Sequence, residues 1–284
     1  MGDEGLWRDF LGPHSITDRM LDVEFTQLSD PGRTREHNED FLGHVLPYTP
    51  EQLRSHGCLF VLADGVGGQQ EGEVASQLTV ETVLAGFSSA KSGDSHKAVL
   101  SRLIQAANIK VYEQGSASAS QAGMASTIVA CALRADRAVV AHVGDSRCYL
   151  IREARARLVT SDHTIAAEQV RLGILSAREA AESPNRHLLS RSVGNDLVVN
   201  VEIDEVQMQK GDLLLQCSDG LHGSVPADDI ASVVTRSDSL HAAAEKLVSL
   251  ANQRDGSDNV SVQLIRVHDV ERTGIYRGRP YNLR

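Results

Sequence analysis

Five consecutive apolar residues at positions 59–63 lead directly into Asp64, and three glycines follow within the next four positions. A short continuous apolar run of this kind predicts a strand that is buried on both faces. A carboxylate at the end of a buried strand is costly unless another group pairs with it, and glycines let a ligand come close to the backbone. The stretch is therefore either a strand that ends in an Asp-Gly turn or a carboxylate aimed into a site.

The same arrangement, an acid beside the end of an apolar run, recurs along the chain. Asp145 and Asp219 each follow such a run, whereas Asp40 and Asp258 each precede one. Because folds commonly place functional residues in the loops that join strands, this recurrence favours a site that is built from strand ends.

The spacing of apolar residues predicts the order of helices and strands. Helical spacing covers residues 71–87, 96–113, 226–234 and 240–252, and Asp238 is expected to cap the last of these helices. Strands are expected over residues 23–28, 41–46, 59–63, 127–133, 137–143, 147–152, 198–206, 212–217 and 259–267, with loops at 47–57 and 115–123. This order lacks the regular alternation of a parallel α/β fold, so we expect an α+β protein with antiparallel sheets and helices outside them.

We expect one large domain over residues 23–267, because 284 residues can bury a sizeable core and no linker divides the chain. Residues 160–195 are polar and short of large apolar side chains, which predicts an insertion that lies over the domain. Within it, Ser176 and Glu179 have the spacing of a capping box that opens a short helix.

The two ends of the chain lie outside this predicted domain. Residues 1–22 form an N-terminal extension, and residues 268–284 form a C-terminal tail with several arginines. The extension is interpreted either as a partly ordered segment or as one docked amphipathic turn built from Trp7, Phe10 and Leu11.

Composition narrows the class of protein. Hydrophobic residues make up 41% of the chain and charged residues 23%, which is ordinary for a globular protein. The formal net charge of −10 argues against nucleic acid and anionic membranes as partners. The four cysteines lie in or beside predicted core strands without a Cys-x-x-Cys pair, which indicates a reducing compartment. With no signal-like segment and no apolar run near ~20 residues, we expect a cytoplasmic protein without membrane insertion.

Convergence of Asp64, Asp219 and Asp258 would create strong repulsion, which a divalent cation would relieve. The ligands on offer are all oxygens, and these suit Mg²⁺ or Mn²⁺. Zinc is not expected, because no His or Cys pair has the required spacing. Two such ions can activate a water and hold a phosphoryl group, and Arg35 could bind phosphate through two parallel hydrogen bonds. A calcium-binding module is the alternative, but the chain has no Asp-x-Asp-x-Asp-Gly loop.

A series of short motifs resembles the metal-dependent serine/threonine protein phosphatases of type 2C. The Asp-Gly-x-Gly-Gly sequence and the shape of the insertion are most similar to the bacterial branch of that family. The motifs occur in the family's order across residues 24–267, and so many ordered motifs are a specific signal. They are Asp30-Pro31-Gly32, Arg35-x-x-Asn38-Glu39-Asp40, Asp64-Gly65-Val66-Gly67-Gly68, Gly144-Asp145-Ser146-Arg147, Ser161-Asp162-His163-Thr164, Ser218-Asp219-Gly220-Leu221 and Asp258-Asn259-Val260.

The resemblance implies a fold and an activity. The fold would be an α+β arrangement in which a β-sandwich of two antiparallel sheets is flanked by helices, in four layers, with the metal site at one end. The activity would be Mn²⁺- or Mg²⁺-dependent hydrolysis of phosphoserine and phosphothreonine in proteins by a metal-activated water. Partners would be phosphorylated proteins and an opposing serine/threonine kinase in bacterial signalling.

The resemblance also implies metal ligands. Asp64 would bridge two tightly bound ions, and Gly65 would give its carbonyl oxygen to one of them. Asp219 and Asp258 would bind the other ion. Asp145 would join Asp219 at a third, weaker ion, beside a flap formed by the insertion.

Other residues would act around these ions. Arg35 would bind the substrate phosphate. Asp40, and Glu39 beside it, would hold waters bound to the ions, and Asn259 would lie around the ions without binding them.

The chain departs from many eukaryotic members at Val66, where those proteins carry a histidine that is proposed to protonate the leaving group. The acid is then water on a metal or another residue, and His163 in the flap is available for it. His37 and His142 are interpreted as packing or surface residues. Two other functions stay open, a phosphoprotein-binding pseudophosphatase and a two-metal phosphodiesterase. The first would normally have lost a metal aspartate, and the second usually has histidine ligands.

Overall fold

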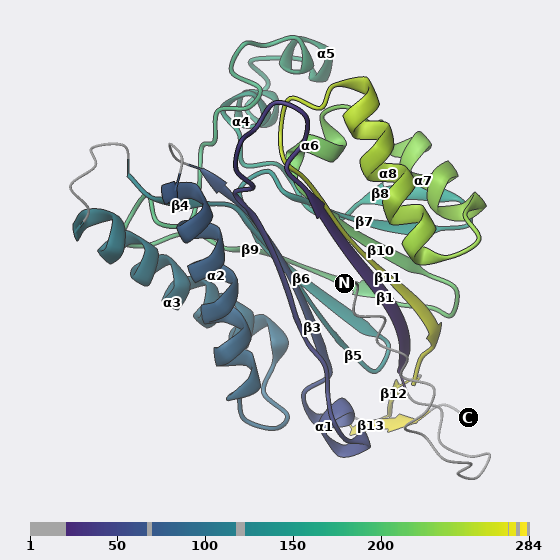
Figure 1. The fold of residues 1–284 in the computed structure, drawn as a ribbon. Helices are drawn as coiled ribbons and strands as arrows, with labels where there is room; N and C mark the ends of the chain where they lie inside the picture. The colour runs from purple at the N-terminus through teal and green to yellow at the C-terminus, as the bar shows by residue number, and fades with distance from the viewer. Residues whose placement is uncertain (1–20, 67–69, 118–122, 272, 277–278, 283–284) are drawn as a thin grey trace.

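The structure is a computed structural model that describes residues 21–66, 70–117, 123–271, 273–276 and 279–282. Two antiparallel sheets stack face to face, and helices cover both outer faces (Figure 1). The first sheet has the order β1 (Asp22–Asp30), β11 (Val260–Asp269), β10 (Leu213–Cys217), β7 (Arg147–Arg152) and β8 (Arg155–Leu158). The second has the order β2 (Asp40–Val45), β3 (Cys58–Val66), β5 (Ile128–Arg134), β6 (Arg137–Val143) and β9 (Glu202–Gln207), and the short strand β4 (Ala125–Ser126) pairs with the end of β3.

Strand β3 shows why the run at 59–63 is apolar throughout. Side chains alternate along a strand, and both faces of this strand are covered. Phe60 and Leu62 lie in the core between the two sheets, whereas Leu59 and Val61 pack in the core beneath the helices on the outer face. The predicted burial on both faces is confirmed.

Helices cover each sheet, which completes four layers and confirms the expected α+β sandwich. Helices α2 (Gln70–Ser88) and α3 (His96–Ala117) lie on the second sheet, and α7 (Ala227–Arg236) and α8 (Leu240–Arg254) lie on the first (Figure 1). The short helices are α1 (Pro50–Ser55), α4 (Ile165–Arg171), α5 (Ala177–Ala181) and α6 (Asp219–His222), and the C-terminal part holds the hairpin of β12 (Thr273–Tyr276) and β13 (Arg279–Asn282).

The insertion carries α4 and α5 and lies at one end of the sandwich (Figure 1). The predicted capping box is confirmed, because the Ser176 hydroxyl accepts from the Glu179 N–H and the Glu179 carboxylate accepts from the Ser176 N–H. An isolated bridge between Thr164 and Leu189 joins the two ends of the insertion to each other, and a second bridge between Val193 and Ser126 binds it to β4. The His163 N–H also donates to the Gly144 carbonyl, so the backbone bonds to the sandwich lie near the ends of the insertion.

Several boundaries differ from the sequence-based expectation. Helix α8 is capped by Ser239, whose hydroxyl accepts from the Ala242 N–H, and not by Asp238. The strand that was expected from residue 198 begins at Glu202, because the chain just before it is bonded to α3. Helix α3 continues through Gly115 into the expected loop, and α1 forms within the expected loop at 47–57. Residues 1–20, including Trp7, Phe10 and Leu11, lie outside the described residues.

The four cysteines are buried and free, which confirms that they pack in the core. Burial raises the pKa of the Cys58 and Cys131 thiols to about 12, so both are protonated at neutral pH. No helix in the described part of the chain is long and apolar enough to cross a membrane.

Candidate active site

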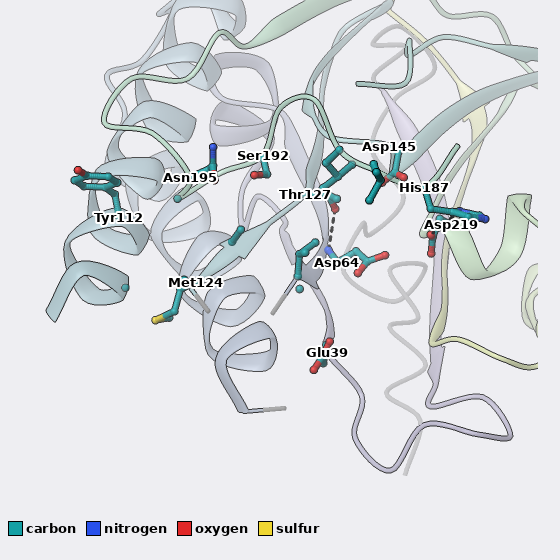
Figure 2. Close-up of a pocket in the computed structure, with 18 of the residues that line it drawn as sticks. Glu39, Asp64, Tyr112, Met124, Thr127, Asp145, His187, Ser192, Asn195 and Asp219 are labelled. Carbon is teal, nitrogen blue, oxygen red and sulfur yellow. Dashed lines mark hydrogen bonds and ion pairs between the residues drawn. The ribbon is translucent and has the colours of Figure 1, made fainter. Parts of the chain in front are cut away.

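The acids at the strand ends meet at one end of the sandwich. Asp64 lies near the C-terminal end of β3, and Asp145 lies between β6 and β7. Asp219 opens α6 just after β10, and Asp258 precedes β11. These strands are antiparallel neighbours within their sheets, so their ends come to the same edge of the molecule. All four line one cavity of about 870 Å³, together with Glu39 (Figure 2).

The carboxylates in this cavity disfavour one another's charge. Burial raises the pKa of Asp64 well above its usual value, and the carboxylates of Asp40, Asp219 and Asp145 raise it further. Burial and the nearby Asp219 raise the pKa of Asp145 to about 7. Burial and Asp258 raise the pKa of Asp219. A cation would relieve this repulsion, which makes the cavity a fitting site for a metal.

Asp40 lies behind Asp64, with the two residues opposite each other in the pairing of β2 with β3. Its Oδ2 accepts from the Ser218 hydroxyl at 2.7 Å, but its buried Oδ1 has no hydrogen-bond partner among the described residues. Burial raises the pKa of this carboxyl to about 7. A buried acceptor without a partner is rare in a native protein, and here it fits a water that accompanies a bound cation.

The backbone of Asp64 is fixed from the neighbouring strand. Its N–H donates to the Thr127 hydroxyl at 3.0 Å, and its carbonyl accepts from the Thr127 N–H at 2.8 Å (Figure 2). The Ser126 hydroxyl also donates to that carbonyl, at 3.0 Å. Thr127 is held in turn by a 2.7 Å hydrogen bond between its hydroxyl and that of Ser146. No sequence pattern singled out Thr127, because its partners lie far away along the chain.

Gly65 is explained by close packing of the backbone. A Cβ atom at this position would lie 2.1 Å from the Gly72 carbonyl oxygen, at the start of α2. The Gly65 N–H donates to the Glu39 carbonyl at 3.0 Å, which brings the loop before β2 against the end of β3. Only glycine allows this approach, which keeps Glu39 and the Gly65 backbone at the cavity.

Arg35 lines the cavity beside Asp258. Its Nη2 lies 2.8 Å from Asp258 Oδ2, and both side chains are partly exposed. A partly exposed ion pair contributes little stability, so the guanidinium can exchange this carboxylate for a phosphate at low cost.

Asn259 positions the loop that carries Arg35. Its Nδ2 donates to the carbonyls of Pro31 and His37, both at 2.9 Å. Its Oδ1 accepts from the Glu39 N–H at 2.8 Å. Both amide hydrogens are thus committed to backbone groups, and these contacts support a role for Asn259 in positioning the loop that lines the cavity.

His163 does not line the cavity, so the expectation that it could act as the acid finds no support in the geometry. Its ring stacks on His142 with centroids 4.8 Å apart. Its Nδ1 accepts from the Gly144 N–H at 3.1 Å, and its Nε2 lies 3.2 Å from Glu202 Oε2. Burial lowers its pKa. His163 therefore fixes the turn that presents Asp145.

The cluster of His142, His163 and Glu202 brings three metal-binding side chains within 4.8 Å. The two imidazole planes are only 14° from parallel, so their in-plane lone pairs run side by side instead of converging on one ion. This arrangement is poor for coordination, and His142 keeps the packing role that the sequence suggested.

His187 of the insertion does line the cavity, although no sequence pattern pointed to it. Its Nδ1 lies 3.9 Å from Asp219 Oδ2, and about half of its side chain is exposed (Figure 2). His187 belongs to no recognisable motif, whereas His163 lies in Ser161-Asp162-His163-Thr164, so the sequence directed attention to His163 alone.

Asp145 does not form an ion pair with its neighbour Arg147. Arg147 binds Asp162 instead, through Nε at 2.8 Å and Nη2 at 2.6 Å. The Asp145 carbonyl accepts from His222 Nε2 at 2.9 Å, which fixes the turn while the carboxylate faces the cavity (Figure 2).

Comparisons with known proteins agree with this site. The chain matches the sequence model of the family described as Protein phosphatase 2C over residues 35–262, a stretch that contains all the acids lining the cavity. It is 31% identical over 254 residues to the serine/threonine phosphatase stp of Listeria welshimeri, covering 88% of this chain and 96% of that protein. It is 29% identical over 249 residues to the protein phosphatase PhpP of Streptococcus pneumoniae, covering 87% and 98%.

Solved structures show the same likeness. The serine/threonine phosphatase of S. agalactiae superposes with a TM-score of 0.78 at 33% identity, covering 87% of this chain and 100% of that one. The catalytic domain of the phosphatase PstP, solved in complex with two manganese ions, superposes with a TM-score of 0.73 at 30% identity, covering 88% and 100%. This chain belongs to the protein phosphatase 2C family, in its bacterial branch.

Proposed function

We propose that this chain is a metal-dependent protein phosphatase that hydrolyses phosphoserine and phosphothreonine in proteins. The observation that carries the proposal is the convergence of Asp64, Asp219 and Asp258 in one cavity with an arginine at its edge. The oxygen-only set of ligands and the family of the chain support it.

The ligands fit Mn²⁺ or Mg²⁺, as two tightly bound ions and a third, weaker one. The carboxylates of Asp64, Asp219 and Asp258 and the carbonyl of Gly65 would hold the two tight ions, and Asp145 would hold the third with Asp219. When bound, such ions supply an activated water and offset the negative charge of the phosphoryl group. The manganese bound to PstP supports this choice of metal.

The side chains around the ligands orient the substrate and waters. Arg35 would release Asp258 and bind the phosphate oxygens through its guanidinium. Asp40 would hold a water through Oδ1, the atom that has no partner within the described chain. Glu39 faces the same cavity and would hold a further water.

We also propose the substrates of the enzyme, the enzyme that opposes it and the compartment in which it acts. The substrates would be phosphorylated proteins, and the opposing enzyme would be a serine/threonine kinase, which the names of the relatives support. The buried free cysteines support a reducing compartment such as the cytoplasm.

Three substrates test the proposal. With Mn²⁺, the purified chain should hydrolyse p-nitrophenyl phosphate and a phosphothreonine peptide, but barely hydrolyse bis(p-nitrophenyl) phosphate. EDTA should abolish turnover, and Asp64→Asn should match the EDTA-treated protein. Faster turnover of the diester would indicate a phosphodiesterase, and binding of the phosphopeptide without turnover would indicate a pseudophosphatase. Activity that survives EDTA or needs zinc would rule out the proposed metal site.

A further inference from the structure

The cavity extends beyond the acidic cluster. Figure 2 shows Tyr112 and Met124 at one end and Asp64, Asp145 and Asp219 at the other. The residues that Figure 2 labels at this far end, Tyr112, Met124 and Asn195, all line the cavity, and none of them is acidic or basic. At ~30 Å³ per water, a volume of about 870 Å³ corresponds to some thirty waters, more than two ions and a phosphoryl group need.

The wall of this far half is fixed before any substrate arrives. Gly194 adopts φ +89°, and a Cβ atom there would lie 2.4 Å from a Val111 methyl and 2.7 Å from the Met124 carbonyl. Its N–H donates at 2.8 Å to Oδ1 of the buried Asn108, whose Nδ2 donates at 2.8 Å to the Asp196 carbonyl. The end of the insertion is therefore bonded to α3, and a wall held in this way binds without paying much entropy of ordering.

Exposed apolar side chains continue from this half onto the surface. Leu197 and Val198 follow the lining residue Asn195 and are 57% and 74% exposed. Ile109 lies one helical turn from Tyr112 on α3, so it is on the same face of that helix. An apolar path that runs out of an active-site cavity is typical of a surface that contacts a protein.

We propose that the far half of the cavity binds a side chain of the substrate polypeptide a few residues from the phosphorylated Ser or Thr, and that it selects a large apolar side chain there. This inference rests on the proposed phosphatase activity. Successive residues of an extended chain advance ~3.3 Å each, so a polypeptide with its phosphate at the acids would pass along this wall. A charged side chain would lose its hydration there without gaining a partner, whereas Leu or Met would bury apolar surface.

Matched phosphopeptides test the inference. Each peptide carries one phosphothreonine with serine at the three positions on either side, and leucine, aspartate or lysine then replaces serine at one position at a time. At one or more positions, the unmodified chain should show kcat/KM at least ~10-fold higher for leucine than for serine, aspartate or lysine. The ratio between leucine and serine peptides is measured within each protein, so it does not depend on the amount of active enzyme.

Two variants and two controls locate the selectivity. Tyr112→Ser and Met124→Ser should bring the leucine-to-serine ratio close to one. Leu172→Ser removes an exposed leucine of the insertion that does not line the cavity, and Tyr48→Ser removes an exposed tyrosine elsewhere. Both controls should keep the full ratio.

The outcomes separate this inference from the proposed function. Equal turnover of leucine and serine peptides at every position would overturn the inference and leave the phosphatase activity intact. A ratio that persists in both Tyr112→Ser and Met124→Ser would also overturn it. Absence of turnover for all peptides and for p-nitrophenyl phosphate would instead refute the proposed function.

Discussion

Thr127 is hydrogen-bonded to both backbone groups of Asp64, the N–H and the carbonyl. Thr127→Val keeps the size of the side chain but leaves the Asp64 N–H without its acceptor and the Ser146 hydroxyl without its partner. We expect the free energy of unfolding to fall by about 1–3 kcal/mol. Because Asp64 would lose its fixed position, the affinity for Mn²⁺ should fall as well, which urea unfolding and calorimetry would measure.

The control for Thr127 is Thr79→Val. Thr79 is also buried, but its hydroxyl donates at 2.7 Å to the Ala75 carbonyl inside α2, away from the cavity. This variant should keep the metal affinity. Equal metal affinity in both variants would show that Thr127 contributes only to stability.

Arg35 contacts Asp258 and faces the cavity, so its proposed role is in the binding of phosphate. Arg35→Ala should mainly raise KM, with a loss of ~2 kcal/mol or more in kcat/KM, because a charge-assisted hydrogen bond is removed. Steady-state kinetics with a phosphopeptide would measure this. Arg33→Ala is the control, because Arg33 does not line the cavity. Similar KM values for both variants and the parent chain would refute the role.

Asp145 should tune catalysis through a weak third ion without building the pair of tight ions. One or two carboxylates with waters make a weak site, which fills only at high metal concentration. Asp145→Ala should keep the fold and the tight ions, lose most activity on phosphopeptides and lose the weak phase of a calorimetric titration. If the variant keeps the weak phase, Asp145 is a turn residue held by His222.

At the scale of elements, the spacing and length of the apolar runs predicted the core strands and the long helices well, because the burial of one face or of both faces of an element determines where its apolar residues stand. The predicted boundaries were wrong where contacts with residues distant in the sequence determine where an element begins. The chain around residues 196–197 cannot join β9, because Asn108 and Gln105 of α3 bind its carbonyls. Ser239 and Asp238 can both cap a helix, and only the observed backbone shows that Ser239 does so.

The insertion is the element whose exchange should change the choice of substrate. Figure 1 places α4 and α5 at the end of the sandwich where the strand ends meet, and α4 has one buried residue, Ala166. The exchange should be confined to residues 165–188, because His163 fixes the turn before Asp145 and Val193 lies in the core.

Replacing residues 165–188 with the segment of a related enzyme should alter preference among phosphopeptides more than turnover of p-nitrophenyl phosphate. The small substrate needs the acids and Arg35 but has no polypeptide for the insertion to contact. Kinetics on both substrates would measure the effect. Equal changes for the two substrates would mean that the insertion acts on the catalytic centre itself.

At the scale of the whole molecule, the carboxylates could be predicted because each follows or precedes an apolar run, and their convergence follows from antiparallel pairing. His187 and Tyr112 could not be predicted, because a lone side chain reaches the cavity only through the path of the insertion and of α3. His163 shows the converse. It belongs to a recognisable motif, yet its ring stacks on His142 and it does not line the cavity, which favours a structural role over that of the acid.

The collected carboxylates make the stability of the whole fold depend on pH and metal. The pKa of Asp40 and of Asp145 is raised to about 7 in the folded chain, from an ordinary value of 3.8. The folded state therefore binds more protons than the unfolded state between these values, so stability without metal should fall as pH rises from about 4 to about 7. Each group in this window contributes up to ~1.4 kcal/mol per pH unit.

Mn²⁺ should offset this loss, because it binds only the folded arrangement of carboxylates and removes their repulsion. The rise in Tm caused by millimolar Mn²⁺ should thus be small near pH 5, where protons compete with the metal for the carboxylates. It should be large near pH 7.5, where they no longer do. Thermal unfolding across this range, with Mn²⁺ or with EDTA, would measure both curves. Asp145→Ala removes one of the repelling groups and should flatten the EDTA curve. A Tm that does not respond to Mn²⁺ at pH 7.5, or that rises with pH in EDTA, would contradict the convergence of these acids on a cation.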